Sequence, residues 1–140
     1  MDDEIEPKQL LTTRFTWGYF LAGQLVFAGL GWGAIHGPPR PDDNTTLAWI
    51  LSGLGVVTAL VAPFVVRHLV VPSGNDPVSR AFNPLLAIMS TALAASMFAF
   101  MTFFIASLPL AWALPALAGL GLSISMYPTP TRVSALARRP

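Results

Sequence analysis

Cysteine is absent from this 140-residue chain, and charged side chains are scarce. The absence of cysteine excludes disulfides, thiolate metal sites and cysteine nucleophiles. Eight basic and seven acidic residues make up 11% of the chain, against about 25% in a typical soluble domain. The charges leave three stretches with none, 15–39, 44–66 and 81–131. This pattern excludes a soluble enzyme domain, a nucleic-acid-binding protein and a disordered tail.

The charge-free stretches are long enough to cross a membrane, because a transmembrane helix needs about 20 apolar residues. The first two have room for one span each and the third for two. We therefore expect an all-α integral membrane bundle of four transmembrane helices, and we interpret the first apolar run as a permanent span. The whole chain, 1–140, forms one membrane domain in this interpretation. The expected helices are about 13–35, 46–71, 84–107 and 109–127, with polar tails at 1–12 and 128–140.

Prolines and capping residues place the helix ends, because proline lacks a backbone N–H and fixes φ. The second helix has possible N-caps at residues 43–45 and ends before Pro72. Asn83–Pro84, a capping residue followed by proline, predicts the start of the third helix. A short turn before Pro109 predicts a tight hairpin between the third and fourth helices, and Pro128 ends the fourth.

The basic residues predict the direction of insertion, because short cytoplasmic loops are enriched in lysine and arginine. With both termini cytoplasmic, seven of the eight basic residues are inside and only Arg40 is outside. The aromatic residues agree with two interfacial belts. The inner belt would hold Trp17, Tyr19 and Tyr127, and the outer belt would hold Trp32, Trp49 and Trp112.

Small residues recur at helical spacing in every expected span, and such residues let membrane helices approach closely. They would serve either internal packing or a face for a partner or a second copy, and the sequence leaves both open. The residues of these faces are Gly29, Gly33, Gly55, Ala59, Ala87, Thr91, Ala95, Ala99, Gly119 and Ser123.

No ionisable residue falls at mid-depth, where functional groups of pumps and transporters are usually found. His36 and His68 lie at opposite ends of their helices, about 30 Å apart, and cannot share a metal or haem within one chain. No histidine or carboxylate shares depth with the span hydroxyls, so no nucleophile has a base. We predict no catalytic, cofactor-binding or metal residue, and no cofactor. Gln24, Ser96 and Thr102 are possible pore or substrate contacts.

Several segments resemble small bacterial four-helix inner-membrane proteins that have no assigned function. The resemblance covers 80–131 and rests on the alanine-rich run 83–104, the turn at Pro109 and the closing segment 127–129, together with Gly23-Gln24-Leu25 in the first half. The hairpins more distantly resemble ATP synthase subunit c, whose mechanism depends on a mid-membrane carboxylate. Small multidrug transporters, also of this size, need a glutamate in the first helix. Neither acid is present here, which argues against ion translocation.

The sequence therefore predicts a non-catalytic integral membrane protein, an accessory or scaffolding subunit that acts through helix–helix contacts. The alternative is an oligomeric transporter or channel for a small neutral or apolar solute. The expected partners are the lipid bilayer and either a second copy or a larger membrane complex, in a bacterial cytoplasmic membrane. The net charge of +1 argues against nucleic acid as a binding partner. The three C-terminal arginines would serve orientation or bind anionic lipid.

Overall fold

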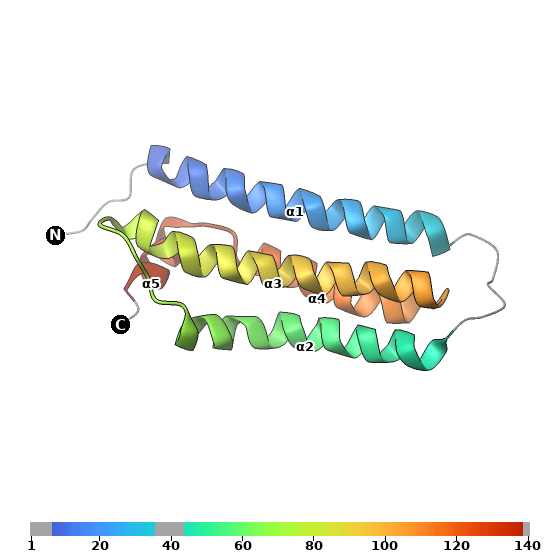
Figure 1. Cartoon of the computed structure of the whole chain (residues 1–140). Helices are drawn as coiled ribbons and strands as arrows, with labels where there is room; N and C mark the ends of the chain where they lie inside the picture. Colours follow the sequence, from blue (N-terminus) through green and yellow to red (C-terminus); the bar gives the residue numbers. More distant parts are fainter. Residues whose placement is uncertain (1–6, 36–43, 139–140) are drawn as a thin grey trace.

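The chain is all-helical in a computed structural model that describes residues 7–35 and 44–138. In this described part of the chain, four longer helices run alternately in opposite directions, and a short fifth helix turns across one end (Figure 1). They are α1 (Pro7–Ile35), α2 (Thr45–Leu69), α3 (Pro77–Ile105), α4 (Pro109–Ser125) and α5 (Pro130–Ala137). The all-α prediction is confirmed.

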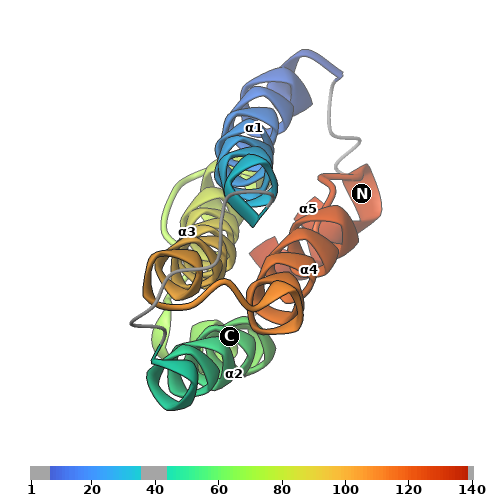
Figure 2. The same ribbon diagram turned by 90° about the vertical axis from the view of Figure 1, so that its right-hand side faces the viewer.

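The helices α3 and α4 form the centre of the molecule. Viewed along the helices, α1 and α2 lie on opposite sides of the α3–α4 pair (Figure 2). The turn that joins α3 to α4 is only three residues, 106–108, so the expected short turn is present. Because α1 and α2 each pack on one side, both helices leave large apolar side chains exposed on their outer surfaces.

Two helices, α2 and α3, are long and apolar enough to cross a membrane. A third candidate is α4 taken together with α5, although the two helices meet at 93°. Alone, the 17 residues of α4 reach about 26 Å, which is less than the roughly 30 Å of bilayer hydrocarbon. The 29 residues of α1 are long enough, but Gln24 and five glycines make α1 less apolar. Within 7–35 and 44–138, the structure thus has two or three membrane-spanning candidates, and not clearly the predicted four.

Capping chemistry explains where the helices begin. Asn44, one of the expected caps, accepts a hydrogen bond from the Leu47 N–H and starts α2. The expected start of α3 at Asn83–Pro84 is wrong, because Asp76–Pro77 is the same motif seven residues earlier. The Asp76 carboxylate accepts hydrogen bonds from the backbone of residues 78 and 79, and the Ser79 side chain completes a capping box. Pro84 is therefore inside the helix.

The expected polar tails contain helical structure. The helix α1 begins at Pro7, six residues before its expected start. In the C-terminal segment, Thr129 accepts a hydrogen bond from the Arg132 N–H and starts α5. Val133 and Leu136 of α5 are buried against α3, in a core cluster that also contains Leu10. The reason is amphipathicity: α5 is too short for a span, but it has one apolar face that packs on the core.

Candidate functional site

A buried polar contact joins α1 to α4. The side chains of Gln24 and Ser123 are both fully buried, and the Gln24 amide Nε2 donates to the Ser123 hydroxyl at 2.5 Å. The Trp17 indole Nε1 donates to the Ser123 backbone oxygen at 2.8 Å. Since lipid offers no competing water, such hydrogen bonds help to hold membrane helices together. Gln24 thus connects two helices of the same chain.

The Gln24 carbonyl oxygen Oε1 has no hydrogen-bond partner among the described residues, and neither does the buried Thr13 hydroxyl. Thr13 is eleven residues before Gln24 on the same helix, which is about 16 Å. The two orphaned acceptors therefore cannot bind one small ligand. The described hydrogen bond of Gln24 goes to Ser123, which is not an ionisable residue. This contact therefore includes neither an acid nor a base for proton transfer.

The structure does not bring Gln24, Ser96 and Thr102 together around a described cavity. Ser96 and Thr102 are 2% and 0% exposed, and each hydroxyl hydrogen-bonds to a carbonyl oxygen of its own helix. Ser96 Oγ is 3.4 Å from the Ala92 oxygen, and Thr102 Oγ1 is 2.8 Å from the Phe98 oxygen. Such bonds satisfy a hydroxyl inside a helix, so both residues have a structural explanation.

Two of the predicted small residues, Gly55 and Gly119, lie at close contacts between helices. A methyl group on Gly55 would be 2.6 Å from the Cβ of Pro115 and 2.9 Å from the Cβ of Phe98. Gly55 therefore marks the meeting point of α2, α3 and α4. A methyl group on Gly119 would be 2.6 Å from the Ala92 oxygen, so α4 contacts the backbone of α3 there.

The other small residues of α2 and α3 are mainly internal as well. Ala59, Ala95 and Ala99 are buried, while Ala87 and Thr91 are partly buried. Thr91 donates its hydroxyl to the carbonyl oxygens of Ala87 and Ile88. For these positions, close packing within the chain accounts for the small-residue pattern.

The GxxxG pair of α1 behaves differently. Gly29 and Gly33 are exposed, and no described atom lies within 4 Å of a methyl group placed on either one. The buried glycine of this region is Gly31, where an added methyl group would overlap the indole of Trp112. The spacing of small residues left internal packing and a partner face open for Gly29 and Gly33, and it did not indicate Gly31, because helix rotation decides which face meets α4.

The basic residues of the described chain gather at one end of the molecule, which we call the basic end. It contains the starts of α1 and α3, the end of α2, and α5 (Figure 1). Its basic residues are Lys8, Arg14, Arg67, Arg80, Arg132 and Arg138. Within 7–35 and 44–138, Asp76 is the only acidic residue. Among the described residues, this end thus has six basic side chains and one acidic side chain.

Asp76 has a structural task at this end. The Ser79 backbone N–H, assisted by the Ser79 hydroxyl, donates to the carboxylate and lowers the pKa of Asp76 below its usual value of 3.8. His68 is exposed beside Arg67 in the last turn of α2. His36 lies outside the described residues. The described part of the chain contains no cluster of three His, Asp or Glu residues that could bind a metal.

Aromatic contacts mark both ends of the molecule. Trp17 and Tyr127 meet edge to face near the basic end, with ring centroids 5.0 Å apart. At the opposite end the rings of Trp32 and Trp112 are 6.2 Å apart. These two pairs thus lie toward opposite ends of the molecule.

Comparisons with protein-family models, with curated proteins and with solved structures found no match to this chain.

Proposed function

We propose that the protein is a non-catalytic integral membrane protein that acts as an accessory or scaffolding subunit. It would bind a transmembrane helix of its partner through the outer face of α1. The observation that carries this proposal is the exposure of Gly29 and Gly33. Exposed glycines weaken a helix without contributing packing inside this chain. A close contact with another helix is the common use of GxxxG in membranes.

The exposed side of α1 has the spacing of a helix-packing seam. Its residues recur at alternating intervals of four and three, which is the 3.5-residue period of helices packed side by side. We call this set the outer seam: Phe15, Tyr19, Ala22, Val26, Gly29 and Gly33, all of which are exposed. The aromatic residues Phe15 and Tyr19 lie at one end of the seam, and the glycines lie at the other. A partner helix could therefore approach most closely at the glycine end.

We also propose that all four longer helices cross the bilayer, with both termini in the cytoplasm. Gln24 is the most polar residue within the apolar part of α1, and it is fully buried against α4. The lipid-facing surface of α1 is therefore more apolar than its sequence indicates. The few ångströms that α4 lacks are within the mismatch that local bilayer thinning accommodates. The basic end, with its lysine and arginines, would then face the cytoplasm, in keeping with a bacterial inner membrane.

The proposal is tested by purifying the tagged chain from its native membrane in mild detergent. We expect a stable complex, either with a second copy or with a larger assembly. Replacing Gly29 and Gly33 together by leucine should release the chain as a monomer, because leucine side chains would separate the helices. Its thermal midpoint should not fall, since no described side chain or other helix contacts either position and leucine is a better helix former than glycine.

The matched control is Gly53→Leu on α2. Gly53 is also exposed and also has no described atom within 4 Å of an added methyl group. Its variant should keep the complex. Monomeric wild-type protein in several mild detergents would contradict the proposal, and so would equal loss of the complex in the control.

A transporter or channel for a small neutral solute is the weaker proposal. The residues expected to line its pore, Gln24, Ser96 and Thr102, are all at most 2% exposed and face other helices of the same chain. A pore between copies of the chain would need to expose them. Uptake into proteoliposomes that falls in Gln24→Leu would favour transport over the accessory role.

A further inference from the structure

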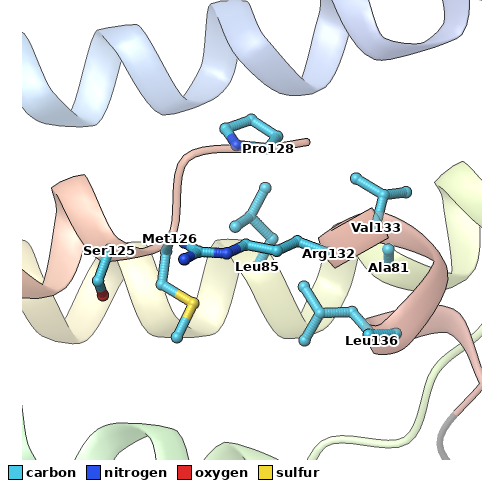
Figure 3. A pocket seen from close by; sticks show the side chains of 9 residues that line it. Ala81, Leu85, Ser125, Met126, Pro128, Arg132, Val133 and Leu136 are labelled. Carbon is cyan, nitrogen blue, oxygen red and sulfur yellow. The ribbon is translucent and has the colours of Figure 1, made fainter. Parts of the chain in front are cut away.

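A cavity of about 330 Å³ lies beside α5 at the basic end. It is walled by α3, by the segment that leads from α4 to α5, and by α5 itself. Leu85, Met126, Val133 and Leu136 make its walls apolar (Figure 3). This volume is at the lower limit of typical small-molecule sites, which are about 300–1,000 Å³. It suits a section of an alkyl chain.

One charged residue borders this apolar space. The exposed Arg132 extends its side chain from α5 across the cavity toward Met126 (Figure 3). Asp76, the only described acid, borders a different cavity, on the side of α5 that carries Ser134 and Arg138. The guanidinium of Arg132 is thus next to an apolar cavity that contains no carboxylate among its lining residues.

The cavity lies at the level of an aromatic belt. Two of its lining residues, Met126 and Pro128, flank Tyr127, whose ring contacts Trp17. Arg14 is 5.8 Å from the centre of the Tyr127 ring and donates to the Pro128 carbonyl oxygen at 3.5 Å. Trp and Tyr concentrate where lipid headgroups meet the hydrocarbon. At this depth, a lipid phosphate and its first methylene groups lie side by side.

We propose that this cavity binds an anionic phospholipid, with the phosphate on Arg132 and the start of an acyl chain between α3 and α5. Guanidinium groups match the phosphate geometry with paired hydrogen bonds, and the apolar walls fit the chain. The Arg132 guanidinium, with no carboxylate among the residues that line the cavity, favours an anionic headgroup over a zwitterionic one. The proposal needs a membrane location but not the accessory role, so either one can fail without the other.

The experiment measures phospholipid retained by the purified full-length chain, using native mass spectrometry with added phosphatidylglycerol or phosphatidylcholine. Wild type should retain phosphatidylglycerol preferentially. Arg132→Gln should weaken that retention about tenfold, equivalent to about 1.4 kcal/mol. The matched control is Arg138→Gln, which removes the same charge from the other side of α5 and should change retention little.

A second pair of variants tests the acyl-chain part. Ala135 is exposed and lines this cavity, whereas Ser134 lines the neighbouring one. Ala135→Leu should fill the cavity and reduce retention while Arg132 stays in place, and Ser134→Leu should not. Circular dichroism checks that each variant keeps its helices. Because Ala135 is on the surface, this pair decides the question even if Arg132→Gln does not fold.

Three results would overturn the proposal. Equal losses in Arg132→Gln and Arg138→Gln would indicate general attraction to charge. Unchanged retention in Ala135→Leu would remove the cavity from the binding site. Displacement of the lipid by inorganic phosphate alone would indicate a simple anion site that does not use an acyl chain.

Discussion

Gly119 gives the sharpest test of how the helices pack. A methyl group there would be 2.6 Å from the Ala92 carbonyl oxygen and 2.9 Å from Ser96 Oγ. The first neighbour is backbone and cannot rotate away, so α3 and α4 must separate. On the same helix, Gly121 is exposed and has no described atom within 4 Å of an added methyl group. The two glycines are thus a matched pair.

The magnitude follows from two opposing effects. Alanine is better than glycine inside a helix by about 0.8–1.0 kcal/mol, and this gain applies to Gly119→Ala and Gly121→Ala alike. Overpacking a close contact costs about 1–3 kcal/mol, and this cost applies only at Gly119. We therefore expect Gly119→Ala to be less stable than Gly121→Ala by about 1–3 kcal/mol. The comparison removes helix propensity from the result.

The assay is unfolding of each purified variant in mixed micelles with increasing sodium dodecyl sulfate, followed by circular dichroism. Gly121→Ala should unfold at or above the wild-type midpoint, and Gly119→Ala should unfold below it. If Gly119→Ala equals or exceeds Gly121→Ala in stability, then α3 and α4 do not make the close backbone contact described here.

Two further predictions concern single polar groups. Gln24→Leu should lower the free energy of unfolding by about 1 kcal/mol, because Ser123 loses its donor; an unchanged unfolding midpoint would contradict the α1–α4 hydrogen bond. Hydrogen bonds lower the pKa of Asp76, so its stabilising contribution is present at neutral pH and is lost as the pH falls below 3.8 and through the lowered folded-state pKa. Asp76→Ala should therefore be less stable than wild type at neutral pH and nearly equal to it in acid, and a difference in midpoint that does not shrink in acid would refute the capping role.

The capping and proline rules predicted most helix ends, and they failed where two segments satisfied the same rule. Asn44 was among the expected caps and is the cap of α2. Asp76–Pro77 and Asn83–Pro84 satisfy the same start rule, and only the structure shows that the first one has Ser79 to complete a capping box. The helix α5 was not predicted, because eight residues give only a weak periodic pattern of apolar side chains. Its folding depends on the apolar surface that α3 supplies.

At the candidate sites, too, the sequence gives the spacing of residues along a helix but not the rotation of that helix toward its neighbours. The spacing of small residues correctly placed Gly55 and Gly119 among the packing residues. It could not distinguish Gly29 and Gly33, which face outward, from Gly31, which packs on Trp112. Likewise, Gln24 was recognised as the polar residue of α1, but its partner Ser123 lies 99 residues away. Such a contact depends on how α1 and α4 are rotated against each other.

The outer seam of α1 is tested most directly by site-specific cross-linking in the native membrane. The chain contains no cysteine, so Gly29→Cys and Gly53→Cys each introduce a single thiol. Both glycines are exposed, and they lie at similar depths, about 9 Å and 12 Å along their helices from the end opposite the basic end. We expect Gly29→Cys to give a cross-linked dimer or a larger adduct, and Gly53→Cys to give little. Equal yields from the two positions would contradict a helix-binding function of α1.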